Sequence, residues 1–185
     1  IQLPELLYDR VVEVSERLDA EGKIIKSLNE NEVRTALKKA KIDGINSVAI
    51  AFMHSYINPN HENIIAEIAH EEKFDQISVS HKVSPLIKLI GRGDTTVVDA
   101  YLSPILRRYV NQVSEELEKN KSTKLMFMQS NGGLTDANLF QGKDALLSGP
   151  AGGVVSMVQT GKQAGYNKLI GFDTVSYTHL RAHET

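Results

Sequence analysis

The sequence contains no cysteine and no tryptophan, and it has no large excess of charge of either sign. Without cysteine the chain can form neither disulfides nor thiolate metal sites, which fits a cytoplasmic location. The 21 Lys and Arg residues and 23 Asp and Glu residues give a formal net charge of −2, so we expect no nucleic-acid partner. No apolar run approaches the roughly 20 residues that a membrane-spanning helix needs, so we expect no membrane partner either.

What the sequence does contain is the pattern of an α/β protein. Hydrophobic residues make up 41% of the chain and charged residues 24%, as in globular domains. Alternating or continuous apolar runs predict a hairpin from 11–15 and 23–25 and strands over 45–53, 77–80, 124–128 and 168–173. Helical spacing predicts helices over 29–40, 59–72, 85–90, 95–102, 104–119 and 151–164. Strands that alternate with helices predict an α/β layer fold.

Two helix starts can be placed more closely. Asn29 is a suitable N-cap for the first helix, because its side chain can accept a hydrogen bond from a free N–H group of the first turn. Ser103 followed by Pro104 predicts a new helix there, since proline is tolerated at the first helical position.

Two histidines, His54 and His61, lie between the second expected strand and the helix after it. Loops at the carboxyl ends of strands are common ligand sites in α/β sheets, and imidazole can serve as a ligand, an acid or a base. The alternative is that Asn58 and Pro59 start the helix and that His61 and Glu62 fill its polar first turn.

A glycine-rich segment, Ser130-Asn131-Gly132-Gly133, directly follows the strand expected at 124–128. Glycine lets the backbone approach a ligand closely and adopt a positive φ, and both polar side chains can donate and accept hydrogen bonds. The segment is either a ligand-binding turn or a tight turn without a ligand.

Ser148, Gly149, Gly152 and Gly153 lie at the start of the last expected helix. The free N–H groups of a helix start can bind an anion, but the small residues serve close helix packing equally well. Asp173 ends the last expected strand, where a carboxylate can hold a metal ion or simply be solvated.

The order of several short motifs resembles the hydantoinase A/5-oxoprolinase family. They extend over residues 2–174, and each is weak singly but specific in combination. They are Pro4–Tyr8, Val11–Val14 with Arg17, His54–Tyr56 with His61–Glu62, Arg92 with Thr95–Thr96, Ala100–Pro104, Met128–Leu134 and Ser148–Val154. Leu125–Met128 and Leu147–Pro150 are most similar to the 5-oxoprolinase branch.

This resemblance implies a fragment of an actin-like, ribonuclease-H-type ATPase fold, in which two phosphate loops hold ATP and Mg²⁺. The second loop would begin at Asp173, which would be the catalytic residue that holds Mg²⁺ through water. Arg92 would contact a phosphate or an oxyanion, or would be a structural residue. The glycine-rich residues Ser130, Asn131, Gly132 and Gly133 would contact nucleotide or substrate. The cleft beside the second phosphate loop would be shaped by Ser148, Gly149, Gly152 and Gly153.

The activity implied is ATP-dependent opening of a cyclic amide, 5-oxoproline, to glutamate, with ATP activating the lactam carbonyl. A hydantoinase or an ATP-dependent ketone carboxylase subunit is the alternative within the family. A non-catalytic structural piece is the third hypothesis. The expected partners are a small cyclic-amide substrate and a hydantoinase-B-like domain or subunit, in a homo- or hetero-oligomer.

The two ends of the chain lead to a further expectation. The chain does not begin with Met, and Val175–Thr185 has neither the Gly-Gly-Thr turn of the family nor a strand pattern. We expect a family domain over 1–174, truncated at both ends, followed by a non-native tail over 175–185 that packs against nothing.

Overall fold

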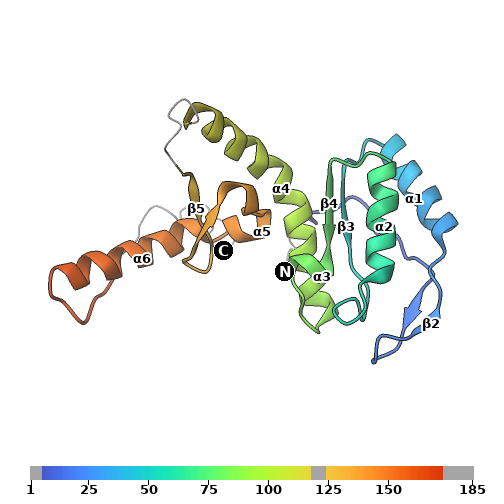
Figure 1. Ribbon diagram of the computed structural model, residues 1–185, viewed down its shortest axis with the longest axis horizontal. Coiled ribbons are helices and arrows are strands. Elements are labelled where there is room, and N and C mark those ends of the chain that lie inside the picture. The colour runs from blue at the N-terminus through green and yellow to red at the C-terminus, as the bar shows by residue number, and fades with distance from the viewer. Residues whose placement is uncertain (1–5, 118–123, 173–185) are drawn as a thin grey trace. The chain divides into compact units, whose positions relative to one another are not determined.

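The computed structural model describes residues 6–117 and 124–172, and the chain divides into two compact units (Figure 1). Unit 1 is Ile1–Arg107 and unit 2 is Arg108–Thr185. Asp173 and the expected tail over 175–185 lie outside the described residues.

Unit 1 is built around a parallel pair of strands, β3 (Ser47–Ile50) and β4 (Gln76–Val79), with α2 (Asn60–Glu71) between them in sequence. The other elements of the unit are the antiparallel hairpin β1 (Arg17–Leu18) and β2 (Ile24–Lys26), the helix α1 (Glu30–Ile42) and the short helix α3 (Ser80–Val83). Figure 1 shows α1 and α2 on one side of the strand pair, and α3 with the beginning of α4 on the other.

The core of unit 1 lies between this strand pair and the two helices. Its buried residues are Val33, Leu37, Ile50, Ile65, Ile68, Ala69, Phe74 and Val79. The apolar positions of α1 and α2 recur every three or four residues, so each helix presents one face to the strands. The predicted strands and helices of this region are confirmed within a few residues.

The cap and the surface pairing of α1 follow from its sequence. Asn29 accepts a hydrogen bond from the Glu32 N–H at 3.3 Å, as expected of an N-cap. On the exposed side, the hydrogen bond from Arg34 to Glu71 joins α1 to α2 and raises the pKa of the arginine.

The predicted hairpin forms, but its first strand begins later than expected. Residues 11–15 were expected in the strand, yet β1 covers Arg17–Leu18. The reason is that Ser15 pairs with the start of α1 instead of with β2. Its N–H donates to Glu32 Oε2 at 3.3 Å, and its carbonyl accepts from the Asn29 N–H at 3.1 Å.

One long helix, α4 (Leu89–Leu117), replaces the two helices expected at 95–102 and 104–119, so the prediction of a new helix at Pro104 is wrong. The turns before the proline are already helical, and within them the Thr96 hydroxyl donates to the Arg92 carbonyl at 2.7 Å. Ser103 donates to Asp99 Oδ1 at 3.1 Å, so its hydroxyl is engaged one turn back and does not cap a new helix.

The helix expected at 85–90 is also wrong over most of its length. Residues 84–88 form a loop between α3 and α4. The carbonyls of Leu86 and Ile87 in this loop accept hydrogen bonds from the side chain of Arg92, so they are not used within a helix.

Unit 2 contains the antiparallel hairpin β5 (Met126–Met128) and β6 (Leu134–Asp136), a short 3₁₀ helix η1 (Ala137–Leu139), and the helices α5 (Gly142–Ala145) and α6 (Ser148–Gln163). β5 and α6 were predicted, whereas β6, η1 and α5 were not. Phe127 lies between two aromatic rings, with centroids 5.0 Å from Phe140 and 6.3 Å from Tyr109.

The strand expected at 168–173 is not formed over its described residues, 168–172. Ile170 is 99% exposed and Phe172 is 91% exposed. A strand is stabilised by hydrogen bonds to a neighbouring strand, and none pairs with this segment within the described ranges.

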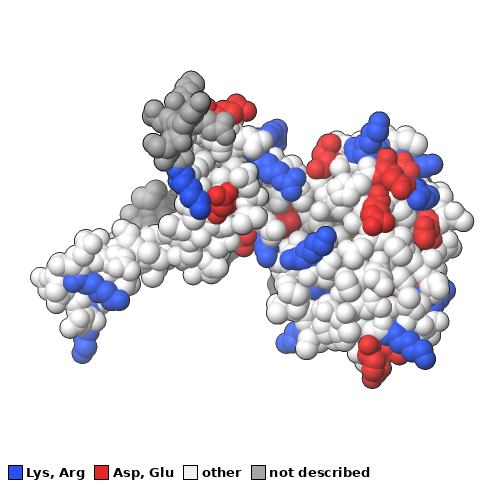
Figure 2. All heavy atoms as spheres, in the orientation of Figure 1, with Lys and Arg blue, Asp and Glu red and all other residues white. Residues whose placement is uncertain are grey.

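The distribution of charge and the apolar character of the helices can both be described. Figure 2 shows acidic and basic side chains interspersed over the visible face of unit 1, as the small net charge predicts. Among the described residues, no helix combines the length and apolar character needed to cross a membrane.

Candidate functional site

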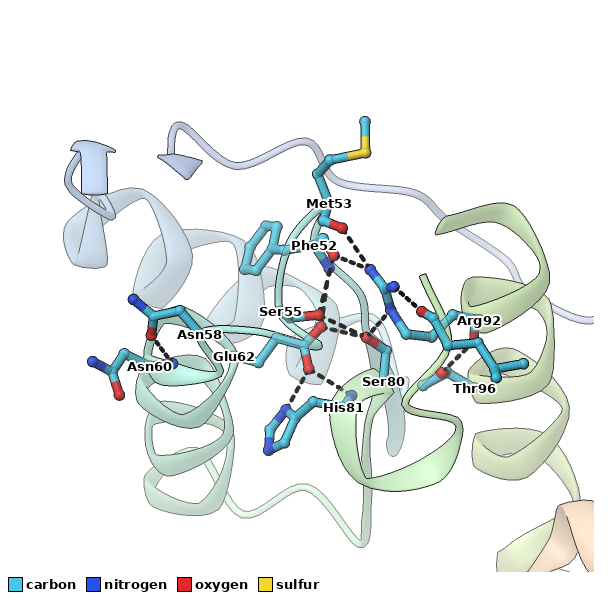
Figure 3. A network of polar contacts seen from close by, with 11 residues as sticks. Phe52, Met53, Ser55, Asn58, Asn60, Glu62, Ser80, His81, Arg92 and Thr96 are labelled. Atoms are coloured by element: carbon cyan, nitrogen blue, oxygen red, sulfur yellow. Dashed lines mark hydrogen bonds and ion pairs between the residues drawn. The ribbon is translucent and has the colours of Figure 1, made fainter. Parts of the chain in front are cut away.

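A buried polar network lies in unit 1, where the chain leaves the carboxyl ends of β3 and β4 (Figure 3). Its centre is Glu62, which is 0% exposed. Glu62 Oε1 accepts from the Phe52 N–H at 3.0 Å and from Ser80 Oγ at 2.5 Å, and Oε2 accepts from the His81 N–H at 3.0 Å. His81 Nδ1 lies 2.6 Å from Oε2. These partners offset the cost of burying a carboxylate.

Arg92 is the second buried charge of this network, and it is also 0% exposed. Its Nε donates to Ser80 Oγ at 2.9 Å, so Ser80 links the arginine to Glu62. Its two terminal nitrogens each donate to two backbone carbonyls, those of Leu86, Ile87, Phe52 and Met53. A guanidinium has five N–H donors, and all five are engaged within unit 1. This geometry favours the structural alternative for Arg92 over contact with a phosphate.

The two predicted histidines have different surroundings. His61 is 4% exposed, and its Nδ1 lies 2.7 Å from Glu16 Oε2. His54 is partly buried, and its Nδ1 is buried without a hydrogen-bond partner among the described residues. Its ring lies 6.2 Å from that of Tyr56, which in turn lies 5.5 Å from the Arg92 guanidinium.

The alternative in which Asn58 and Pro59 start the helix and His61 and Glu62 fill its polar first turn is confirmed, because Pro59 is the N-cap of α2. The helix does begin beside Asn58, whose Oδ1 accepts from the Asn60 N–H at 3.1 Å. However, both His61 and Glu62 are buried and paired with residues from other segments. The pairing partners, Glu16 and His81, are distant in sequence, so the spacing of residues within the helix could not indicate them.

The predicted turn of unit 2 joins β5 to β6 and is closed by internal hydrogen bonds. The Ser130 hydroxyl donates to the Asp144 carbonyl at 2.7 Å and accepts from the Leu147 N–H at 3.0 Å. Gly132 has a φ of +82°, which explains the glycine at this position. The Ser130 side chain therefore fastens the turn to the α5–α6 segment.

Most N–H groups of this turn are consumed by the turn itself. The Gln129 N–H donates to the Gly133 carbonyl, and the Gly132 N–H donates to the Gln129 carbonyl. The Ser130 N–H donates to the Asp144 carbonyl. The Gly133 N–H donates to Asn131 Oδ1 at 2.8 Å. A phosphate site needs several N–H groups that converge on the anion, so this turn does not form one in the described geometry. Asn131 is an exposed residue of this turn.

Ser148, Gly149, Gly152 and Gly153 all lie in the first half of α6. No side chain caps this helix, and a Cβ added at Gly149 would meet nothing within 4 Å. At Gly152 a Cβ would lie 3.6 Å from Met128 Cγ, so that glycine lies where α6 packs on β5. The helix start is therefore open at Gly149, while Gly152 serves packing.

The site residues predicted from the sequence fall into two groups. Arg92, His54 and His61 belong to unit 1, and the residues of the two glycine-rich motifs belong to unit 2. Within unit 2 the turn and the helix start adjoin, because Gly132 faces Val155 of α6 and Ser130 binds the N–H of Leu147. The network residues Glu62, Ser80 and His81 were not predicted as a site.

Comparison with known proteins identifies the family. The hydantoinase/oxoprolinase pattern matches residues 92–178, and the pattern of the hydantoinase/oxoprolinase N-terminal region matches residues 1–73. The chain belongs to the hydantoinase/oxoprolinase family.

Individual relatives agree with this assignment and with an α/β fragment. The chain is 40% identical to 5-oxoprolinase from Saccharomyces cerevisiae over 90% of its own length and 15% of the yeast protein. The ATP-dependent caprolactamase from Pseudomonas jessenii matches with a TM-score of 0.74 and 28% identity, over 82% of this chain and 23% of that one. Nucleotide-free acetone carboxylase, which carries out ATP-dependent acetone carboxylation, matches with a TM-score of 0.75 and 26% identity, over 83% and 22%.

Proposed function

We propose that this chain is part of an ATP-dependent hydrolase of cyclic amide C–N bonds, and that the substrate is 5-oxoproline. The reaction would convert 5-oxoproline, ATP and water to glutamate, ADP and phosphate. The 40% identity to the yeast 5-oxoprolinase carries the proposal. The likeness to a caprolactamase supports it, because caprolactam is also a cyclic amide.

Because the chain spans 15% of the yeast relative, the activity belongs to the whole protein in this proposal. The length beyond this match leaves room for the proposed hydantoinase-B-like domain or subunit. An oligomeric assembly and a cytoplasmic location are further parts of the proposal.

The described residues do not by themselves fit the phosphates of ATP or Mg²⁺. Arg92 has no donor left, the turn at 129–133 uses its own N–H groups, and no cluster of three or more metal-ligating side chains occurs in the described part of the chain. ATP and Mg²⁺ therefore remain proposed cofactors of the whole protein. We propose Asp173 as the Mg²⁺ ligand, the helix start at Ser148 and Gly149 as the part of unit 2 that faces the nucleotide, and Asn131 as a contact to nucleotide or substrate.

The second candidate function is that of an ATP-dependent carboxylase subunit, and the likeness to acetone carboxylase supports it. One assay separates the candidates. ADP release by a purified full-length protein containing this chain is measured with 5-oxoproline, with a hydantoin, and with acetone plus bicarbonate. Stimulation by 5-oxoproline, with glutamate formed in equal amount, is expected. If a hydantoin, or acetone plus bicarbonate, stimulated ADP release and 5-oxoproline did not, the function would be that of another branch of the family. If none of these substrates stimulated ADP release, the proposal would be contradicted.

The role of Asp173 is tested in the same assay. Asp173→Asn is expected to lower ADP release at least a hundredfold, because an amide is a far weaker Mg²⁺ ligand than a carboxylate. Asp94→Asn, which removes an exposed carboxylate from α4, is the matched control and is expected to keep full activity. The isolated 185-residue chain is expected to release no ADP.

A further inference from the structure

One asparagine of the sequence is followed by glycine, and the structure places this pair, Asn131 and Gly132, in the turn between β5 and β6. Asn131 is exposed. The side-chain amide of an asparagine can react with the backbone nitrogen of the next residue. When that residue is glycine, no Cβ shields the nitrogen from the amide carbon. The turn therefore combines two features that favour this reaction, exposure and an unshielded nitrogen.

The reaction consumes only water and releases ammonia. The Gly132 nitrogen forms a bond to Cγ of Asn131, and its proton passes to the side-chain nitrogen, which leaves as ammonia when its bond to Cγ breaks. The product is a cyclic imide. Water then opens the imide at either of its carbonyls, which gives aspartate or isoaspartate. Both products carry a carboxylate where the amide was neutral, and isoaspartate also adds a methylene to the backbone.

The side-chain carbonyl of Asn131 already accepts a hydrogen bond. The Gly133 N–H donates to Asn131 Oδ1 at 2.8 Å. A donor at a carbonyl oxygen stabilises the negative charge that develops on that oxygen when the carbon is attacked. This contact therefore favours attack on the Asn131 amide.

Other hydrogen bonds of the closed turn oppose the reaction. The Gly132 N–H, which belongs to the attacking nitrogen, donates to the Gln129 carbonyl at 2.9 Å. The Ser130 hydroxyl fastens the turn through the Asp144 carbonyl and the Leu147 N–H. A nitrogen that is engaged in this way has to be released before it can attack. The reaction therefore requires local opening of the turn, and the frequency of opening limits its rate.

We propose that Asn131 is the site at which this protein deamidates spontaneously, and that the hydrogen bonds of the β5–β6 turn determine the rate. The modification places a carboxylate in a turn for which a contact to nucleotide or substrate is proposed above. Isoaspartate also lengthens the backbone inside the turn, so the hydrogen bond from Gly132 to Gln129 cannot keep its geometry. The reaction needs no enzyme and no ligand, and it is therefore independent of the proposed hydrolase activity.

The first test compares asparagines within one protein. The full-length protein that contains this chain is incubated at neutral pH, and the conversion of amide to acid at each asparagine is measured by peptide mapping and mass spectrometry. Asn131 is expected to react about fivefold faster, or more, than Asn46 and Asn138, which are also exposed but precede serine and leucine. Asn138 lies in the same unit as Asn131. Equal or slower reaction of Asn131 would overturn the proposal.

The second test separates the chemistry of the pair from the effect of the turn. In urea, where the turn is open, Asn131 of the parent protein is expected to react roughly tenfold faster than in buffer. Ser130→Ala removes the hydroxyl that fastens the turn and is expected to raise the rate in buffer by about fivefold. Ser156→Ala removes an exposed hydroxyl from α6, and this matched control is expected to react as the parent protein does.

In urea all three proteins are expected to deamidate at the same rate, because none of them then has a closed turn. Circular dichroism shows whether the Ser130→Ala protein is folded. If it is not folded, the comparison of buffer with urea for the parent protein still tests the effect of the turn. Control of the rate by the turn would be contradicted by a parent rate that urea leaves unchanged, or by a folded Ser130→Ala protein that reacts as the Ser156→Ala protein does.

Discussion

At the scale of single residues, Arg92 has the largest predicted effect on stability. Lysine in its place would offer three N–H donors on one atom, and these cannot reach Ser80 and the four backbone carbonyls together. Arg92→Lys is therefore expected to lower the free energy of unfolding by about 3 kcal/mol, because buried carbonyls lose their partners. Urea denaturation followed by circular dichroism measures the change.

Arg107→Lys is the control for this substitution, since Arg107 is exposed on the same helix. It is expected to change the free energy of unfolding by less than about 0.5 kcal/mol. If the two substitutions changed the free energy of unfolding by similar amounts, the hydrogen bonds of Arg92 would not be what stabilises unit 1.

Two glycines allow the cost of a backbone conformation to be separated from the cost of a close contact. Gly22 and Gly44 have φ values of +82° and +86°. A Cβ at Gly22 would lie 2.8 Å from Ile57 Cγ2, whereas at Gly44 it would meet nothing within 4 Å. Gly44→Ala is expected to cost about 1 kcal/mol and Gly22→Ala about 2–3 kcal/mol. Equal losses in thermal or urea unfolding would contradict a packed β1–β2 turn.

The residues show why the polar network could not be predicted from the sequence. The family resemblance identified Arg92 as a candidate. Its partners, however, are the backbone carbonyls of Phe52, Met53, Leu86 and Ile87, and every residue type has such a carbonyl, so the sequence gives no indication of them. The glycine-rich turn was located correctly because glycine next to a strand is a local signal. The use of its N–H groups depends on Asp144, which is distant in sequence.

At the scale of elements, the continuity of α4 leads to a prediction for Pro104. Inside a helix, proline leaves the carbonyl four residues earlier without its partner and strains the turn. Pro104→Ala is therefore expected to raise the free energy of unfolding by about 1–3 kcal/mol. If a separate helix began at Pro104, the same substitution would not raise the free energy of unfolding. Urea unfolding therefore distinguishes a continuous α4 from two separate helices.

Pro85→Ala is the control at this scale, because Pro85 lies in the loop between α3 and α4. It is expected to lower the free energy of unfolding by up to about 1 kcal/mol, through greater freedom of the unfolded chain. A gain at Pro85 as large as that at Pro104 would show that the effect is not specific to the helix interior.

The elements that the sequence predicted well are those whose apolar residues form the core themselves. Val33 and Leu37 fix α1, and Ile65 and Ile68 fix α2, so the helical spacing is enough to locate both. The extended α4 was missed because the Ser103–Pro104 pair is a local stop signal. In the structure the Ser103 hydroxyl donates to Asp99 instead of capping a new helix, and the side chains of Ala100 and Val110 are buried on either side of the proline.

At the scale of the whole molecule, the two units differ in how much they bury. Five residues of α2 are buried, namely His61, Glu62, Ile65, Ile68 and Ala69, whereas Gly161 is the buried residue of α6. Backbone amides exchange more slowly where opening exposes more of the core. Hydrogen exchange followed by mass spectrometry is expected to show slower exchange in α2 than in α6. Equal protection of the two helices would contradict this difference in burial.

The short sequence span of the core has a consequence for how the protein is made. All of its buried residues lie between Val33 and Val79, so the contacts are formed between segments that are near in the chain. Local contacts need little loop closure and form quickly. During synthesis, unit 1 can therefore collapse around this core as soon as β4 has left the ribosome, while the residues of unit 2 are still being translated.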